Sequence, residues 1–348
     1  MIELLKSRRK ILGLKSRELA QLVGVDQALI SKFENGERLP TENQIKKLEQ
    51  FLKIEGNQLT VLWLKEKILI ELNQHPKASE AIQLVREELA TYSKRNEYLY
   101  SNDIVSLLDQ IDKLKAQLDE IRQFDSFRIT EALELEYTFE SNRIEGNTLT
   151  LQETDLVINE GLTISGKSMR EHLEAVNHNE AIDYIKDLMK RKISINEREL
   201  LVIHNLILRG IMPEYAGKYR NVQVMIKGSS HMPPQPFLVA KQMEELFHWF
   251  KENKGNLHPV VLAAEMHERL VTIHPFIDGN GRTSRLLMNL ILLSSGYVIA
   301  NIKGDFESRK EYYNALESAR VVKNKEAFIL FVAHVEIQCL KRYLSILS

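Results

Sequence analysis

The 348-residue chain is 44% hydrophobic and carries 47 lysine and arginine side chains against 48 aspartates and glutamates. This length and apolar content suffice for about two packed domains, which excludes a disordered tail protein. The net charge of -1 gives no global attraction to nucleic acids or membranes, so partners have to be inferred from local sites. Glycine and proline are scarce and apolar residues recur mostly at helical spacing, so we expect a mostly α-helical protein.

Two further features concern the compartment. Cys339 is the only cysteine, so the chain cannot form an intramolecular disulfide, as is usual in a reducing environment. The charged start of the chain does not fit a signal peptide, and the longest apolar run, residues 286–300, is too short to span a bilayer. We therefore expect a cytoplasmic protein that makes no contact with membranes.

The first 56 residues have the pattern of short helices joined by tight turns. In the segment 16–40, Gly24 permits a sharp turn, Asp26 can cap the next helix, and Gly36 can end it. This pattern resembles the helix-turn-helix domain of Xre/Cro transcriptional regulators, which implies DNA as a partner. The resemblance places four outward side chains of the second helix against base edges: Gln27, Ala28, Ser31 and Lys32.

The charge of this segment has the sign that DNA binding requires. Residues 1–55 hold 11 basic and 8 acidic side chains, a net charge of +3. A small helical module used for protein contacts is the alternative, because a fold does not dictate its function. We expect DNA affinity to be low in a monomer, so a homodimer is among the assemblies that the sequence allows.

Residues 57–125 are rich in leucine, isoleucine, glutamate and lysine. Apolar residues in this stretch follow a heptad-like spacing: Leu107, Ile111, Leu114, Leu118 and Ile121. Because the repeat lasts for few heptads, a helix packed on its own domain is favoured over a dimerising coiled coil. We expect a helical connector between a domain at 1–56 and a domain at 126–348.

The motif HPFIDGNGRTSR, residues 274–285, lies between two stretches of helical periodicity. Pro275 prevents the first helix from continuing smoothly, and an apolar helical pattern resumes at Leu286. A helix therefore begins near the glycines, with unpaired backbone N–H groups and the positive end of its dipole directed at one spot. Such a spot binds phosphate.

The side chains of this motif suit phosphoryl or nucleotidyl transfer. Asp278 is an oxygen ligand that suits Mg²⁺, and Arg282 and Arg285 share a helical face from which they can neutralise phosphate charge. His274 can take a proton from an attacking hydroxyl, and an ordinary pKa near 6.5 would leave it about half available near neutral pH. We expect Phe276 to point inward and anchor the loop.

The motif resembles the HxFx(D/E)GNGRxxR motif of Fic proteins at every defined position. This resemblance implies a Fic-type α-helical bundle that transfers AMP from ATP, with Mg²⁺, to a Tyr, Ser or Thr hydroxyl of a target protein or of itself. His274 would be the base and Asp278 the metal ligand. The resemblance also implies a set of nucleotide contacts: Gly279, Asn280 and Gly281 as the anion hole, Arg282 at the β-phosphate, Arg285 at the γ-phosphate, and Tyr312 and Tyr313 at the adenine.

Residues 221–237 alternate apolar and polar side chains and turn at Gly228, which predicts a β-hairpin. In Fic proteins a hairpin flap over the site docks the backbone of the target by strand addition. The resemblance therefore implies that a target protein docks on this segment. An ordinary surface hairpin is the alternative.

A helix predicted over about 128–146 carries Ser141 and Glu145 one turn apart, and Gly146 ends it directly after the carboxylate. From the residues alone, a solvated surface side chain is at least as good an interpretation of Glu145 as a functional one. The segment resembles the (S/T)xxxE(G/N) inhibitory motif of Fic proteins, which implies that Glu145 pairs with Arg285 and keeps it from the γ-phosphate. In some relatives the same glutamate orients a water for removal of AMP, and the sequence leaves both directions open.

Two other functions stay open from the sequence. One is a Fic enzyme that uses another donor and transfers UMP or phosphocholine. The other is a transcriptional regulator whose Fic domain senses a nucleotide, so that the first domain delivers the output. Transfer of label from a nucleotide and a DNA gel shift would separate these functions.

Overall fold

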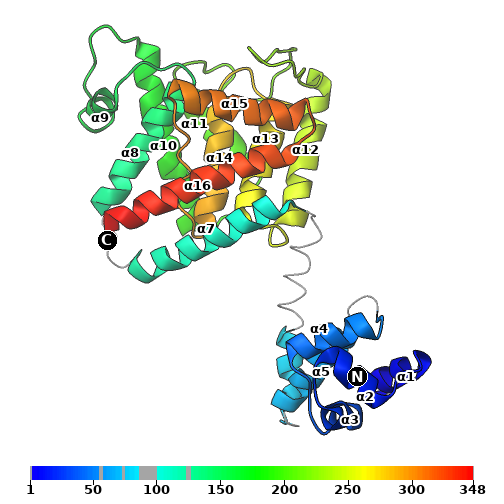
Figure 1. Cartoon of the computed structure of the whole chain (residues 1–348). Coiled ribbons are helices and arrows are strands. Elements are labelled where there is room, and N and C mark those ends of the chain that lie inside the picture. Colours follow the sequence, from blue (N-terminus) through cyan, green and yellow to red (C-terminus); the bar gives the residue numbers. More distant parts are fainter. Residues whose placement is uncertain (1, 55–57, 73–74, 86–99, 123–126, 348) are drawn as a thin grey trace. The chain divides into compact units, whose positions relative to one another are not determined.

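The computed structural model describes the chain apart from residues 1, 55–57, 73–74, 86–99, 123–126 and 348 (Figure 1). The chain divides into two compact units, Met1–Leu89 and Ala90–Ser348. The described residues form α-helices and no β-strand, so the expectation of a mostly helical fold is confirmed. None of the helices in this described part combines the length and the apolar character that crossing a membrane needs.

The first unit is a small helical domain. Asp26 caps its third helix by accepting a hydrogen bond from the Ala28 N–H (2.7 Å), and Gly24 and Gly36 end helices with φ of 78°, as the sequence predicts. Leu19, Phe33 and Trp63 belong to its core. Its helices are α1 (Ile2–Ile11), α2 (Ser16–Val23), α3 (Gln27–Asn35), α4 (Glu42–Phe51) and α5 (Gln58–Leu72), and residues 78–85 are also helical.

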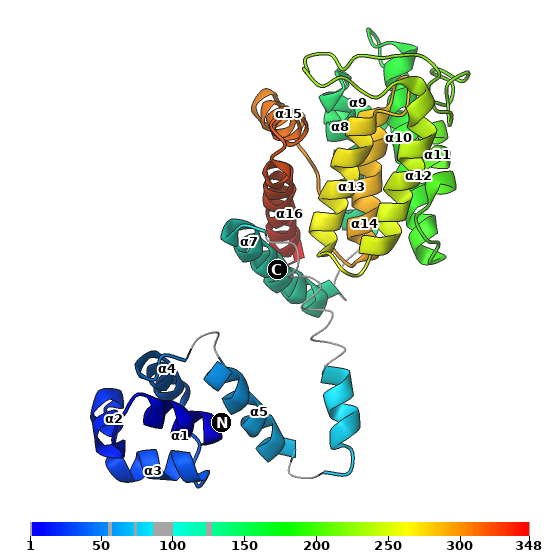
Figure 2. The ribbon, with the colours of Figure 1, turned by 90° about the vertical axis from the view of Figure 1, so that its right-hand side faces the viewer.

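The second unit is a larger helical bundle. Its helices are α7 (Asn102–Ile121), α8 (Phe127–Ile144), α9 (Leu151–Asn159), α10 (Met169–Lys190), α11 (Glu197–Leu208), α12 (Pro236–Asn253), α13 (Pro259–Ile273), α14 (Asn280–Ser294), α15 (Phe306–Arg320) and α16 (Lys325–Leu347). α13 and α14 are buried on nearly every face, because α10, α11, α12 and α16 pack around them (Figure 2). The loop that joins these two central helices therefore starts from rigid, buried elements.

The heptad-like stretch lies in α7, which packs against α16. Ile111 and Leu118 are buried there, and Leu107, Leu114 and Ile121 pack partly buried on the same core. α5, by contrast, packs Leu59 and Trp63 into the core of the first unit. The helices α5 and α7 of the stretch 57–125 thus belong to two separate cores.

The prediction of a β-hairpin at 221–237 is wrong. Residues 221–235, here called the flap loop, make a turn but no strand. Pro233 and Pro234 on the second arm have no N–H to donate, so a ladder cannot form along it. Side chains hold the arms together instead, because Gln223 Nε2 donates to the Pro233 carbonyl (2.9 Å) and Arg220 Nη2 to the Pro234 carbonyl (2.6 Å).

A carboxylate on α15 holds the turn of the flap loop. Glu317 accepts hydrogen bonds from the Ser229 hydroxyl and from the N–H (2.9 Å) and hydroxyl (2.7 Å) of Ser230. The hydrogen bonds from these two serines outweigh partial burial and lower the pKa of Glu317. The loop is therefore fixed by side chains at its base and at its turn.

Candidate active site

The motif forms a tight loop between α13 and α14. α13 ends at Ile273, and the capping residue His274 has a backbone in the left-handed region (φ 50°, ψ 58°). Gly279 (φ 77°) precedes the first residue of α14. The amide of Asn280 closes the loop, since it accepts from the Phe276 N–H (3.0 Å) and donates to the Phe276 carbonyl (2.9 Å). No side chain caps the start of α14, so the N–H groups of its first turn are available to an anion.

His274 is held as a neutral imidazole. Its Nδ1 lies 3.3 Å from the Val271 carbonyl, which assigns the proton to Nδ1 and leaves the Nε2 lone pair to accept one. Burial lowers the pKa of His274 to about 4. The expectation of a half-protonated histidine near neutral pH is therefore wrong, because the fold desolvates this side chain.

His204 supports the loop from α11 and was missed by the sequence analysis. Its ring stacks on Phe276 with 3.6 Å between ring centroids, and Phe276 itself is fully buried. The Gly217 N–H donates to Nδ1 of His204 (3.0 Å), so Nε2 carries the proton and donates to the Asp278 carbonyl (3.0 Å). No local pattern around His204 indicates this role, since its partners lie far along the chain.

Two arginines and two carboxylates alternate in a ring beside the loop, here called the charge ring. Arg170 Nη2 lies 2.6 Å from Asp278 Oδ2, and Arg170 Nε lies 3.0 Å from Glu174 Oε1. Arg282 closes the ring from below the surface, with Nη1 3.3 Å from Glu174 Oε1 and Nη2 3.7 Å from Asp278 Oδ1. Of its members, Asp278 and Arg282 were predicted site residues, whereas Arg170 and Glu174 were not.

The ring keeps Asp278 ionised. Burial alone would raise the pKa of this carboxyl, but the charges of Arg282 and Arg170 and a hydrogen bond from the Gly279 N–H (2.7 Å) together lower it below its usual value. Arg282 is almost completely buried, and its Nε has no hydrogen-bond partner among the described residues. A buried guanidinium with an unused donor is suited to an added anion.

Arg285 and Glu145 meet as the sequence resemblance predicts. Arg285 is 1% exposed and donates from Nη2 to Glu145 Oε1 (2.7 Å) and to the Ser141 carbonyl (2.9 Å), and from Nε to the Ser141 hydroxyl (3.0 Å). The carboxylate of Glu145 lies against Gly281, where an added methyl group would overlap Oε1. Glu145 therefore occupies space directly beside the first turn of α14.

Asparagine side chains fix the chain on both sides of Glu145. Asn142 Nδ2 donates to the Glu174 carbonyl (3.2 Å), and Asn147 Nδ2 donates to the Glu171 carbonyl (3.0 Å) and to Glu174 Oε2 (3.1 Å). Gly146 adopts φ 99° between them, which ends α8. The end of α8 is thus tied to α10 at two points.

The two candidate adenine residues differ in exposure. Tyr312 is buried, and its hydroxyl lies 3.1 Å from His267 Nε2 and 3.5 Å from Arg285 Nη1. Tyr313 is exposed and donates to the Ile144 carbonyl (3.4 Å). Of the two, only Tyr313 has a surface that a ligand reaches without rearrangement.

The DNA-contact candidates lie on α3 of the first unit. Gln27, Ala28 and Lys32 are exposed, whereas Ser31 is half-buried and its hydroxyl donates to the Gln27 carbonyl (3.3 Å). Three of the four side chains are therefore free to meet a ligand on this helix.

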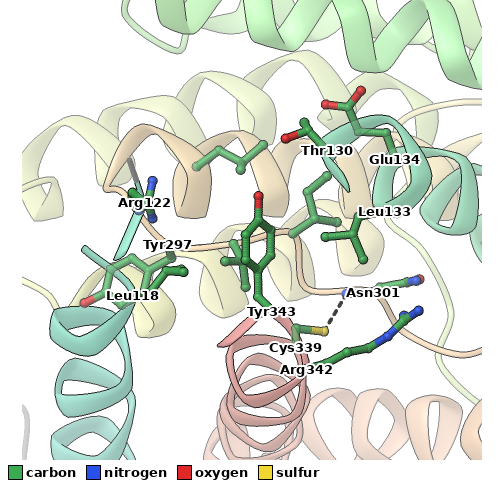
Figure 3. Close-up of a pocket in the computed structure, with 13 residues that line it drawn as sticks. Leu118, Arg122, Thr130, Leu133, Glu134, Tyr297, Asn301, Cys339, Arg342 and Tyr343 are labelled. Atoms are coloured by element: carbon green, nitrogen blue, oxygen red, sulfur yellow. Dashed lines mark hydrogen bonds between the residues drawn. The ribbon is translucent and has the colours of Figure 1, made fainter. Parts of the chain in front are cut away.

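An apolar cavity of about 200 Å³ lies elsewhere in the second unit (Figure 3). Leu118, Leu133, Tyr297, Cys339 and Tyr343 are among its lining residues. No residue of the motif 274–285 lines this cavity, so it is separate from the loop that joins α13 and α14.

Comparisons with known proteins identify two families in the chain. Residues 194–292 match the Fic/DOC family and residues 5–59 match a helix-turn-helix family. A relative called "Protein adenylyltransferase Fic" from Nematostella vectensis is 36% identical over 243 residues, which cover 69% of this chain and 56% of the relative. A relative of the same name from Drosophila willistoni is 32% identical over 343 residues, which cover 95% of this chain and 65% of the relative. The chain thus spans less than two thirds of the length of these relatives.

Solved structures are similar as well. "Fic-1" from C. elegans is 25% identical with a TM-score of 0.63, covering 99% of this chain and 98% of that one. A Fic family protein from Desulfovibrio desulfuricans G20 is 28% identical with a TM-score of 0.62, and the match covers 72% of this chain and 76% of that one. Both family resemblances noted in the sequence are therefore confirmed, and this chain is a Fic/DOC domain protein with an N-terminal helix-turn-helix domain.

Proposed function

We propose that the chain is a protein adenylyltransferase, which transfers AMP from ATP to a hydroxyl group of a target protein or of itself. The observation that carries this proposal is the neutral His274 close to the start of α14. No side chain caps this helix start, and the buried Arg282 and Arg285 lie beside it. Relatives with 32% to 36% identity are called protein adenylyltransferases, which supports the same reaction.

His274 is proposed as the general base. Nε2 accepts the proton of the attacking hydroxyl, whose oxygen forms a bond to the α-phosphorus while the bond to pyrophosphate breaks. The proton remains on the imidazole until solvent or the leaving pyrophosphate takes it. Because the side chain is already neutral at pH 7, no proton has to be removed before it acts.

The phosphates are proposed to bind at the start of α14. The backbone N–H groups of Asn280 and Gly281 form the anion hole beside Gly279, whose own N–H donates to Asp278 Oδ1, and Arg282 and Arg285 hold the outer phosphates. The absence of a side-chain cap and the unused Nε of Arg282 support this assignment. Tyr313 is proposed to contact the adenine, and Tyr312 to support Arg285 from within the core.

Asp278 fits the Mg²⁺ that this reaction would use. The described residues contain no group of three or more histidine, cysteine or acidic side chains that could hold a metal alone. Mg²⁺ in nucleotide sites commonly binds one or two carboxylates and takes its other ligands from phosphates and water. The ionised Asp278 suits this arrangement, in which Mg²⁺ supplies charge neutralisation of the phosphates.

The flap loop is proposed to dock the target protein. Its first arm pairs with no strand, and a segment of this kind can accept an added strand of a target. Val222, Met225 and Met232 are exposed on it, and exposed apolar side chains beside a site are typical of docking surfaces. Arg220 connects this loop to the site, because its Nε donates to the His274 carbonyl (2.8 Å).

Labelled nucleotides test the proposed reaction. We expect the purified chain to acquire label from ATP labelled on the α-phosphate but not from ATP labelled on the γ-phosphate, because only the inner phosphate is transferred. Mass spectrometry should then find an AMP adduct on a hydroxyl side chain. Transfer of the γ-label alone, or transfer only from UTP or CDP-choline, would overturn the proposal in favour of another donor chemistry.

We also propose that the helix-turn-helix domain binds DNA, because α3 exposes Gln27 and Lys32 on a domain of this family. We expect the substitution Lys32→Ala to weaken binding to a fragment of the promoter of its own gene by about fivefold to tenfold, and to lower its dependence on salt. The substitution Lys77→Ala, at an exposed lysine outside α1 to α5, is the control. A gel shift at several salt concentrations measures both, and no shift with the unmodified chain would contradict the proposal.

A further inference from the structure

We propose that Arg170 is a positioning residue that competes with the divalent cation for Asp278 and so sets how much cation the site requires. The inference rests on the proposed function, in which Asp278 takes Mg²⁺. Arg170 Nη2 lies 2.6 Å from Asp278 Oδ2, so it forms an ion pair with the carboxylate that would hold the metal.

The contacts around Asp278 leave little room for a cation while Arg170 stays. Oδ1 accepts the Gly279 N–H (2.7 Å) and faces Arg282 Nη2 at 3.7 Å. Oδ2 is the oxygen that is not tied to the loop, and Arg170 covers it. A positive guanidinium next to the carboxylate also repels a second cation, so metal binding requires Arg170 to move.

Arg170 is able to move because, although it pairs with two carboxylates, about half of its side chain is exposed to solvent. Its side chain is 52% exposed, in contrast to Arg282 at 2%, so it can swing into solvent without leaving a buried charge. Glu174 holds Arg170 close to Asp278, since Nε of Arg170 lies 3.0 Å from Glu174 Oε1. The arrangement is therefore a reversible cover over the carboxylate.

Glu174 is itself fixed by the segment that carries Glu145. It is 8% exposed and accepts from Asn147 Nδ2 (3.1 Å), two residues after Glu145. The end of α8 thus contributes to two blocks at once: Glu145 occupies Arg285, and Asn147 fixes the carboxylate that holds Arg170 on Asp278. Both blocks oppose binding of a metal–triphosphate complex.

The substitution Arg170→Gln tests this competition. We expect the Kd of Mn²⁺, a paramagnetic substitute for Mg²⁺, to fall by about threefold to fivefold, because a partly exposed ion pair is removed from Asp278. Electron paramagnetic resonance measures free Mn²⁺ directly, without turnover. The full chain with Glu145→Gly and His274→Ala serves as the parent, since it cannot use up ATP during the titration.

Arg191→Gln is the matched control, since Arg191 directly follows α10, the helix that carries Arg170, and likewise pairs with an acid four residues away, Asp187. The titration is run with and without ATP, and the unfolding midpoints of all variants are compared. An unchanged Kd of Mn²⁺ in Arg170→Gln overturns the inference. A higher Kd of ATP in this variant also overturns it, because Arg170 would then be a phosphate ligand. Absence of ATP binding in every variant would instead refute the proposed function, and with it the cation site on which the inference rests.

Discussion

Replacing His274 with alanine is expected to lower the rate of AMP transfer by about 10² to 10⁴-fold, the usual contribution of a general base. The loss should appear in kcat rather than in the Kd of ATP, because the phosphates bind at the start of α14 and not on the imidazole. The measurement is the initial rate of label transfer from the α-phosphate, together with ATP binding by calorimetry. His248→Ala, at an exposed histidine of α12, is the control and should keep the full rate.

The pH profile gives a second readout of the same residue. Because burial lowers the pKa of His274 to about 4, the base stays neutral above about pH 5, and protonation removes it only as the pH falls through about 4. We therefore expect a rate that this group leaves unchanged between about pH 6 and 8. A fall centred near pH 6.5 in the unmodified chain would show that the imidazole is solvated and would contradict the assignment. A full rate of AMP transfer in His274→Ala would show that His274 is not the general base.

The sequence predicts the parts of the site that depend on neighbours along the chain. Pro275 and the following glycines indicate the break between α13 and α14, and Asp26, Gly24 and Gly36 mark helix boundaries in the first unit. These signals are local, since a cap or a left-handed residue acts within one turn. The pairing of Glu145 with Arg285 spans 140 residues along the chain, and only the family resemblance indicated it.

The parts that the sequence did not predict depend on tertiary packing. The low pKa of His274 comes from burial, and the residues next to it in the sequence do not predict that burial. His204 and Arg170 reach the loop from α11 and α10, and neither sits in a pattern that points to phosphate chemistry. The absent hairpin is different, because Pro233 and Pro234 already stand in the sequence and could have excluded a ladder on that arm.

Replacing Glu145 with glycine is expected to raise transfer of AMP by a factor of about 5 to 30. One charge-assisted hydrogen bond, from Arg285 Nη2 to Oε1, is lost. Because the contact is single and the Glu145 side chain is 32% exposed, it contributes about 1 to 2 kcal/mol, at the lower end for such pairs. Arg285 keeps its bonds to Ser141, so the guanidinium stays in place and gains a free position for phosphate.

Two measurements separate the directions in which Glu145 can act. If the carboxylate competes with the γ-phosphate, Glu145→Gly should tighten ATP binding and raise labelling together, and adding Arg285→Ala should cancel both gains. If Glu145 instead orients a water for removal of AMP, labelling should rise with no change in the Kd of ATP, and isolated modified protein should lose AMP only in the presence of the unmodified chain. If Glu145→Gly changes neither ATP binding nor labelling, the ion pair is a structural contact. The position of Glu145 beside Gly281 is compatible with that outcome.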